Sequence, residues 1–340
     1  KGDEGERVDA LFRDMVAKVE LMTNKHAVRK FAAPFNAVIK HHARVGTADA
    51  GLQVFDTMAR LGVERNKISF TTLITSLANT GDYESVLRIY RETPNHEEIC
   101  LVANTAVAGS IIRAALELDE GETVKSVLEL FCSTHFEGKR DSEKQEEALG
   151  LFNTVLARKS KEGAHEDCVK IMELMGQHGL AASEDSFAHL VLSCKMDGQW
   201  EEAMEIVEAF KNSKGKSSIK VFSACISVLV EAKQWQGALS ILDQMESEGV
   251  TPNEVTFNSA IEALDASSEF VRAELVFQSA LRSEEIYTDW LQPSSNRALM
   301  LDLHRLPVAV ARAAIMHTLG EMSQGGLEIA DPMIVVTGRG

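Results

Sequence analysis

The sequence has little proline, no closely spaced cysteines and no long apolar run. Six prolines in 340 residues are too few for a disordered or collagen-like chain. The five cysteines form no C-x-x-C pair, which argues against a zinc site and favours reduced thiols in a cytosol, plastid or mitochondrial interior. The most apolar stretch, residues 101–112, is much too short to cross a bilayer, so we expect no membrane partner.

Basic charge is also scarce. Lys and Arg number 35 against 51 Asp and Glu, which gives a formal net charge of −16. Domains that bind nucleic acid through their overall charge are usually basic, so the sequence argues against a nucleic-acid-binding protein of that kind. It does not exclude binding in a local basic or neutral groove. The 45% hydrophobic and 25% charged content is globular, and the length suggests about two domains. Because the chain begins at Lys1, we expect a fragment or processed form that a targeting peptide could precede.

An internal repeat of 35 residues runs through most of the chain. Three independent sets of residues show this period: phenylalanines, small helix-facing residues, and glycines at expected turns. They are Phe35 and Phe70, then Phe152, Phe187, Phe222 and Phe257; Ala50 and Ser85, then Cys168, Ala203, Ala238 and Ala273; and Gly46 and Gly81, then Gly163 and Gly198.

Each unit is predicted to form two helices. In residues 219–253, apolar residues recur at helical spacing from Val221 to Leu229 and again from Trp235 to Met245. Gly249 is expected to end the second helix, because glycine readily adopts positive φ. A single hairpin cannot bury its apolar face, whereas stacked hairpins can. We therefore predict a mostly α fold, an α-solenoid of about seven helix-turn-helix repeats.

Both ends of the unit carry recurring motifs. First helices begin as PFNAVI (34–39), SFTTLI (69–74), LFNTVL (151–156), VFSACI (221–226) and TFNSAI (256–261), and second helices end as DTMARLGVERN (56–66) and DQMESEGVTPN (243–253). These motifs resemble the pentatricopeptide repeat, with its T-Y-N-T-L-I start and M-x-x-x-G-x-x-P-D/N end. The predicted organisation is a helical lead-in or cap at 1–31 and a solenoid at 32–288, with a solvated loop inserted at 136–147. Its units are 32–66, 67–99, 100–148, 149–183, 184–218, 219–253 and 254–288.

The resemblance implies binding of single-stranded RNA, one base per repeat. In the family, the fifth and last residues of a unit contact the base. Asn36 with Asn66 implies a pyrimidine, Asn153 with Ser183 a cytosine, Ser223 with Asn253 an adenine, and Asn258 with Thr288 a weak pyrimidine preference. Thr71 suits a purine, Asn104 has no clear partner, and Ser218 stands with Ala188, which cannot hydrogen-bond a base.

The second residue of a unit normally packs an apolar side chain against the base. Ala33, Ile68, Leu101 and Val255 fit this pattern, whereas Gly150, Asp185 and Lys220 do not. An alternative is that the Asn and Ser residues only cap helices. The acidic charge also leaves open a protein-interaction scaffold, whose solenoid would bind a basic protein. A basic or neutral concave face favours RNA, and an acidic one favours protein.

After residue 288 the periodicity changes. Residues 289–298 are predicted to be a linker, followed by a strand at 300–303, a helix at 308–319 and a strand at 332–336. This order indicates a parallel crossover and thus an α/β domain. Two motifs, Leu301-Asp302-Leu303-His304 and Thr337-Gly338-Arg339-Gly340, resemble the small MutS-related (Smr) domain. The region 299–340 would be its first half, with Arg305 where that family usually has glycine.

The Smr resemblance implies contact with nucleic acid, either DNA or structured RNA, and nicking in some members. Asp302 and His304 alternate along the predicted strand, so they are candidate catalytic residues that could bind a metal or activate water. Thr337, Gly338, Arg339 and Gly340 are a candidate phosphate loop. For this chain we expect no enzyme activity and no cofactor, with a divalent metal only if an intact Smr domain is catalytic. The resemblance favours a chloroplast, then a mitochondrion, and a role in organellar RNA processing, stabilisation or translation.

Overall fold

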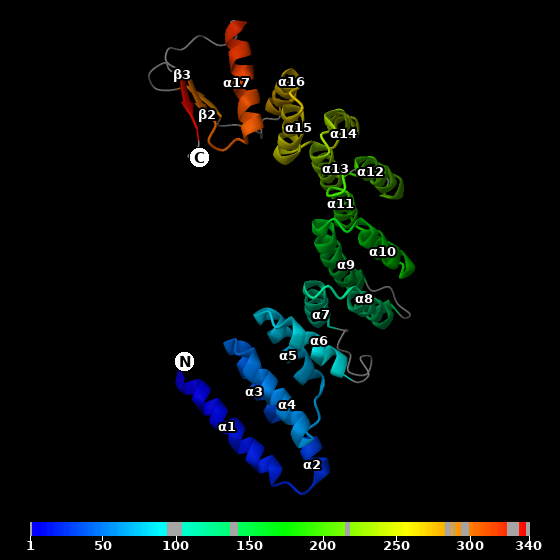
Figure 1. Ribbon diagram of the computed structural model, residues 1–340, viewed down its shortest axis with the longest axis vertical. Helices are drawn as coiled ribbons and strands as arrows, with labels where there is room; N and C mark the ends of the chain where they lie inside the picture. The colour runs from blue at the N-terminus through cyan, green and yellow to red at the C-terminus, as the bar shows by residue number, and fades with distance from the viewer. Residues whose placement is uncertain are drawn as a thin grey trace. The chain divides into compact units, whose positions relative to one another are not determined.

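The computed structural model describes residues 2–93, 104–136, 142–214, 218–282, 287, 290–293, 299–324 and 333–337. The chain divides into two compact units: the first holds residues 1–155 and 174–180, and the second holds 156–173 and 181–340. In Figure 1 both units are built mainly from helices, and the labelled strands lie towards the C-terminus.

In the first unit, consecutive helical hairpins stack through their first helices, because α3, α5 and α7 contact one another in turn. Helix α1 precedes them: it contacts α3 and α4, and the Phe12 ring meets Phe35 edge-on at 6.0 Å. The helices are α1 (Gly2–Glu20), α2 (Lys25–Arg29), α3 (Ala32–Val45), α4 (Ala48–Leu61), α5 (Lys67–Thr80), α6 (Tyr83–Glu92), α7 (Thr105–Glu117) and α8 (Gly121–Phe136).

The second unit repeats this arrangement, with α11, α13 and α15 in successive contact. Helices α9 (Ser142–Glu162) and α10 (His165–Gln177) contribute residues to both units. Stacked hairpins within each unit are what the α-solenoid prediction requires. The remaining repeat helices are α11 (Glu184–Ser193), α12 (Trp200–Lys214), α13 (Ile219–Glu231), α14 (Trp235–Ser247), α15 (Glu254–Ala266) and α16 (Phe270–Leu281).

The turn inside each hairpin sets the register of the repeats. One residue with positive φ separates the two helices, and glycine adopts this conformation without the steric penalty of a Cβ. Four of the turns use glycine, as the sequence predicts, and three use other residues. In chain order these residues are Gly46, Gly81, Asp119, Gly163, Gly198, Lys233 and Ser268.

This register corrects the predicted start of the third repeat. Helix α7 begins at Thr105 and α8 at Gly121, with Asp119 at the turn between them. The side chain of Asn104 accepts hydrogen bonds from the backbone N–H groups of Ala106 and Val107, which fixes the helix start there. The third hairpin therefore begins at 105 rather than 100, and the second repeat extends to Asn104. Residues 94–103, which include Leu101, lie outside the described residues.

The predicted loop at 136–147 is wrong over much of its length. Phe136 still belongs to α8, and α9 begins at Ser142, while 137–141 lie outside the described residues. The helix extends this far because Ala148 is fully buried and Glu147 is anchored by Lys144 at 2.8 Å and by the Thr105 hydroxyl at 2.5 Å.

The core of each unit follows the 35-residue period. Phe35, Phe70, Phe152 and Phe222 are no more than 1% exposed. Phe70 meets Phe55 edge-on at 5.1 Å, and the Arg65 guanidinium lies 4.5 Å from the centre of the Phe55 ring. Such aromatic and cation–π contacts add to the burial of apolar area.

A small sheet ends the chain. Strands β1 (Leu291–Pro293), β2 (Leu299–Asp302) and β3 (Met333–Val336) lie in the order β1-β2-β3, with β2 antiparallel to β1 and parallel to β3. Helix α17 (Val308–Ser323) joins β2 to β3, which is the predicted strand–helix–strand order, and contacts α15 and α16. The predicted linker at 289–298 instead contains β1. None of the described helices combines the length and apolarity needed to span a membrane.

Candidate nucleic-acid interface

The fifth and last residues of the first repeat lie together. The Asn36 amide nitrogen donates to Oδ1 of Asn66 at 3.0 Å, and Asn66 caps α5 by accepting from the N–H groups of Ile68 and Ser69. Asn36 is only 7% exposed, and the Ser69 hydroxyl donates to its Oδ1 at 2.6 Å. The predicted pair is thus in contact, with its carbonyl oxygens used inside the protein.

In the sixth repeat, the fifth and last residues are linked through a third residue, Thr256. Asn253 caps α15 by accepting from the Thr256 N–H at 2.9 Å, and the Thr256 hydroxyl donates to the same oxygen at 2.8 Å. That hydroxyl also lies 3.1 Å from Oγ of Ser223. Sequence reasoning did not assign a role to Ser69 or Thr256; the signal was present as an Asn followed three residues later by a hydroxyl residue.

The predicted role of Asn104 needs correction. It precedes the first turn of α7 and caps it, so it occupies the same place as Asn66 and Asn253. It is therefore the last residue of the second repeat and stands with Thr71, whereas the fifth residue of the third repeat is Gly109. The third repeat has no polar side chain at its fifth position.

The fifth repeat is poorly suited to reading a base. Ser218 is 4% exposed, and its hydroxyl donates to Glu184 at 2.9 Å instead of capping α13. Asp185 and Lys220, the second residues of the fifth and sixth repeats, form an ion pair at 2.6 Å. This hydrogen bond raises the pKa of Lys220, and the pair neutralises the charge that would repel a phosphate.

The remaining predicted residues fall into two groups. Ser183 caps α11 in a reciprocal arrangement with Ser186, and Asn153 is half-buried on α9. The Asn258 side chain accepts a hydrogen bond from the buried Tyr287 hydroxyl, and burial raises the pKa of that phenol. Thr288, the predicted partner of Asn258, lies outside the described residues.

Large apolar side chains are exposed at the second position. Ile68 is 57% exposed and Val255 is 64% exposed, each in the first turn of a first helix beside a capping asparagine. Ala33 and Gly150 are exposed as well. Exposed β-branched residues next to polar groups form a surface on which a base could pack.

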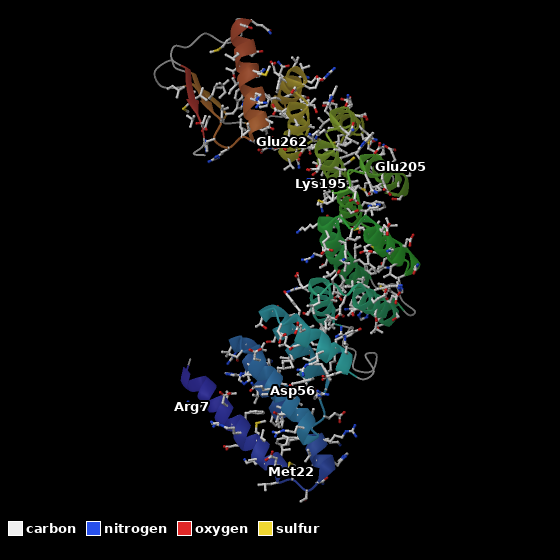
Figure 2. The ribbon with its side chains drawn as sticks, viewed as in Figure 1. Arg7, Met22, Asp56, Lys195, Glu205 and Glu262 are labelled. Carbon is white, nitrogen blue, oxygen red and sulfur yellow. The ribbon has the colours of Figure 1, made fainter. Side chains whose placement is uncertain are left out.

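The charge of the first helices changes along the chain. In the first unit, helices α3, α5 and α7 carry four cations and one anion, a net charge of +3. In the second unit, α11, α13 and α15 carry one cation and six anions, a net charge of −5, and Figure 2 labels one of these anions, Glu262. Phosphate attraction is therefore expected from the first three repeats.

The C-terminal candidates are only partly brought together. Strand β2 ends at Asp302, so His304 lies in the following turn and not on the strand, contrary to the prediction. The two side chains are nevertheless hydrogen-bonded, which lowers the pKa of Asp302. Arg305 donates from Nε to His304 Nε2 at 3.1 Å and occupies the nitrogen that a general base would use. Thr337 is exposed after β3, and Gly338, Arg339 and Gly340 lie outside the described residues.

One mixed cluster was not anticipated from the sequence. His165, Cys194 and Glu202 place possible metal ligands within 4.8 Å of one another. Cys194 and Ser193 approach Nδ1 of His165 at 3.5 and 2.7 Å, whereas Glu202 approaches Nε2 at 3.1 Å. Burial raises the pKa of the Cys194 thiol to about 12. Because the ligands approach opposite edges of the ring, a single ion does not fit all three in this geometry.

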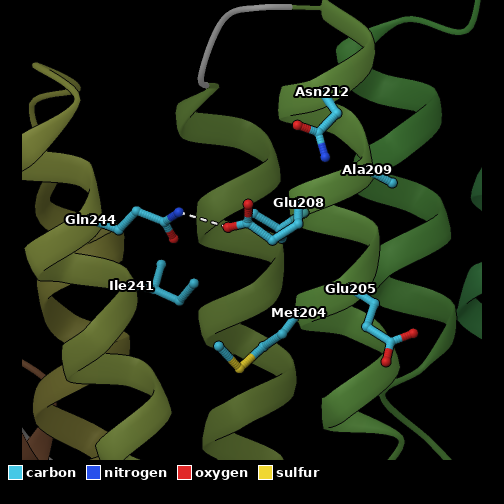
Figure 3. Close-up of a pocket in the computed structure, with 8 residues that line it drawn as sticks. Met204, Glu205, Glu208, Ala209, Asn212, Ile241 and Gln244 are labelled. Atoms are coloured by element: carbon cyan, nitrogen blue, oxygen red, sulfur yellow. Dashed lines mark hydrogen bonds between the residues drawn. The ribbon is translucent and has the colours of Figure 1, made fainter.

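A shallow hollow of 420 Å³ lies between the second helices α12 and α14 (Figure 3). Met204, Val207 and Ile241 supply apolar surface, and Glu205 and Glu208 supply negative charge. Gln244 donates to Glu208 at 2.8 Å across it.

Comparisons with known proteins agree with the repeat motifs. Residues 35–94 match the family model described as the pentatricopeptide repeat domain, and residues 217–264 match that of the PPR repeat family. A chloroplastic pentatricopeptide repeat-containing protein of Arabidopsis thaliana is 24% identical over 142 residues, which cover 41% of this chain and 27% of that protein. Human pentatricopeptide repeat-containing protein 1, mitochondrial, is 25% identical over 115 residues, 34% of this chain and 16% of that protein.

Residues 35–94 and 217–264 therefore contain pentatricopeptide repeats, and the chain spans only a sixth to about a quarter of the length of these two curated relatives. Among solved structures, maize PPR10 is similar at 16% identity with a TM-score of 0.49, over 97% of this chain and 49% of that one. PPR10 in complex with an 18-nucleotide psaJ RNA element is similar with a TM-score of 0.47, over 82% of this chain and 38% of that one.

Proposed function

We propose that the repeats bind single-stranded RNA sequence-selectively, with one base at the start of each first helix. One observation carries this proposal: at the first and sixth repeats, the fifth and last residues are linked through hydrogen bonds at one helix start. Exposed Ile68 and Val255 stand beside the corresponding caps. Small polar groups next to an exposed apolar side chain suit a splayed base, which needs both an edge contact and a stacking surface.

The corrected register changes the expected RNA. The second repeat gains a last residue, so Thr71 and Asn104 would read a purine, by analogy with Ser223 and Asn253. The third and fifth repeats would read no base. In repeat order, the element is a pyrimidine, a purine, any base, cytosine, any base, adenine and a weakly preferred pyrimidine.

The test is selection from a randomised single-stranded RNA pool at low salt, where electrostatic attraction is greatest. We expect the retained RNAs to share that element. Asn253→Asp keeps a good helix cap but removes the amide donor, so it should abolish the adenine preference at one position. Asn212→Asp, on second helix α12, is the matched control and should leave the preference unchanged. No retention of RNA at low salt would refute the proposal.

A protein-interaction scaffold is the second candidate. The net charge of −5 on the first helices of the second unit and the acidic hollow between α12 and α14 favour it there. A Glu205→Lys, Glu208→Lys double variant would weaken binding of a basic protein partner and leave RNA binding by the first unit intact.

We also propose that residues 299–340 are the start of an Smr domain that contacts DNA or structured RNA. The strand–helix–strand order and the Asp302–His304 contact support it. Nicking would require an intact domain and displacement of Arg305 from His304. Incubation of the chain with labelled RNA and DNA hairpins tests this contact, and Asp302→Asn should abolish any cleavage.

An organellar location, in a chloroplast or a mitochondrion, is proposed from the curated relatives, among which one is named chloroplastic and another mitochondrial. A role in RNA processing, stabilisation or translation would follow. Immunoblotting of purified organelles tests the location, and sequencing of RNA crosslinked to the protein in those organelles tests the role.

A further inference from the structure

The third residue of a repeat contacts the fifth residue of the preceding repeat. Thr256 is third in the seventh repeat and lies 3.1 Å from Ser223, and Ser69 is third in the second repeat and lies 2.6 Å from Asn36. Both third residues are fully buried, so their hydroxyls cannot themselves contact a ligand. They can act only through the residues that they hold.

Proton accounting fixes the direction of the bond between Ser223 and Thr256. A threonine hydroxyl has one proton, and Thr256 donates it to Oδ1 of Asn253 at 2.8 Å. Ser223 must therefore donate to Thr256. This bond uses the only proton of Ser223 and leaves its oxygen as an acceptor. Asn253 uses Oδ1 for its cap, so its amide nitrogen remains as a donor.

The Ser223 oxygen, an acceptor, beside the Asn253 amide nitrogen, a donor, complements the hydrogen-bonding edge of adenine but not that of guanine. Adenine presents the N6 amino donor next to a ring-nitrogen acceptor, whereas guanine presents the O6 acceptor in the place of the amino group. If the Ser223 hydroxyl could rotate freely, it could donate a hydrogen bond to O6 of guanine, and the repeat would then bind guanine as well. We propose that Thr256 is a positioning residue that fixes the polarity of Ser223 and so makes the sixth repeat select adenine over guanine. This inference rests on the proposed RNA-binding function.

The rest of the chain varies in the same way. Where the fifth residue has no hydrogen-bonding side chain, the next third residue is apolar: Ala188 precedes Val221, and Gly109 precedes Leu151. A Cβ built on Gly109 would lie 3.5 Å from Cδ2 of Leu151, so these two positions face each other.

The second repeat provides an internal contrast. It has the same reading chemistry as the sixth, a hydroxyl and an asparagine, but the third residue that follows is Val107. Without a hydroxyl there, the Thr71 side chain has, among the described residues, a single long bond of 3.4 Å to the carbonyl oxygen of Ile68. The second repeat should therefore accept either purine, whereas the sixth should accept adenine only.

The experiment measures Kd by fluorescence anisotropy for the full chain with the pool-selected RNA and its versions carrying A or G at the second or sixth recognised position. We expect wild type to prefer A over G about tenfold at the sixth position, the effect of one lost hydrogen bond, and less than about twofold at the second. Thr256→Val should reduce the sixth-position ratio to about twofold or less, and Thr256→Ser should restore it. Val107→Thr should raise the ratio at the second position.

The outcomes separate this inference from the function on which it rests. If wild type binds no RNA, the proposed function fails. If wild type binds and prefers A at the sixth position, but the folded Thr256→Val variant keeps the full ratio, the positioning role of Thr256 is refuted. If Thr256→Val does not fold, Val107→Thr decides alone, since a purely structural threonine would not change base preference there.

Discussion

The exposed valine at the second position of the seventh repeat allows a quantitative test of base stacking. Val255 on α15 is 64% exposed, and Val271 on α16 is 68% exposed, so the two residues differ chiefly in the helix that carries them. Complete burial of a valine side chain contributes about 1.5–3 kcal/mol. Covering the exposed part of Val255 with a base would therefore contribute at most about 1–2 kcal/mol.

Val255→Ala should consequently weaken RNA binding by at most about 5- to 30-fold, because about 1.4 kcal/mol corresponds to a factor of ten in Kd. Its free energy of unfolding should fall by less than about 1 kcal/mol, since only a third of the side chain is buried in the protein. Val271→Ala should cause the same small loss of stability and no loss of affinity. Equilibrium binding of the selected RNA and urea unfolding measure the two quantities. Equal affinities for the two variants would refute the assignment of the first helices as the RNA-binding face.

Three further predictions concern stability and reactivity. Lys233→Gly should raise the free energy of unfolding by about 0.5–1 kcal/mol, because Lys233 has a φ of 56°, whereas Gly198→Ala should lower it. Urea unfolding measures both free energies, and a lower stability of Lys233→Gly would contradict the turn assignment. Burial lowers the pKa of His42, so below about pH 6.5 the unfolded state binds more protons than the folded state. The free energy of unfolding should therefore decline as pH falls through that value and level off below the folded pKa, and the decline should be smaller in His42→Asn. In a Cys100→Ser variant, the four buried thiols of the native protein should react with a disulfide reagent at pH 8 far more slowly than those of the protein unfolded in urea. The reason is that burial raises the pKa of Cys132, Cys194 and Cys225 to about 12 and that of Cys168 to about 11. Rapid reaction of the native protein would contradict their burial.

Periodicity was sufficient to predict most of the hairpins, because a 35-residue unit places the same phenylalanine and the same turn at each step. It failed at the third repeat, where extra residues occur on both sides of the hairpin. There the turn residue is Asp119 rather than glycine, so no repeated letter marked the register. Apolar residues at 101–103 then resembled a helix start, and only the capping bonds of Asn104 place it correctly.

The candidate site was less predictable than the fold, because its geometry depends on contacts between repeats. The sequence indicated Asn36 and Ser223, but their contacts with Ser69 and Thr256 join residues 33 positions apart. A strand prediction based on alternation likewise placed His304 on β2, whereas the strand ends two residues earlier, at Asp302. Strand ends depend on pairing partners, and β1 was itself hidden in a segment predicted to be a linker.

The side chains that cap the first helices are the same ones proposed to read bases, and this sharing restricts what the last position of a repeat could read. Asn66, Asn104 and Asn253 each accept from backbone N–H groups through Oδ1, so the orientation of each amide is set by its own helix. The nitrogen is then the group left for a ligand, and it can only donate. A rotated amide would leave the helix N–H groups without their acceptor, a loss of about 1 kcal/mol. In the three repeats that end in these asparagines, the fold thus fixes the last position as a hydrogen-bond donor, and a choice between bases that differ in polarity would come from the fifth residue and from the residue that positions it.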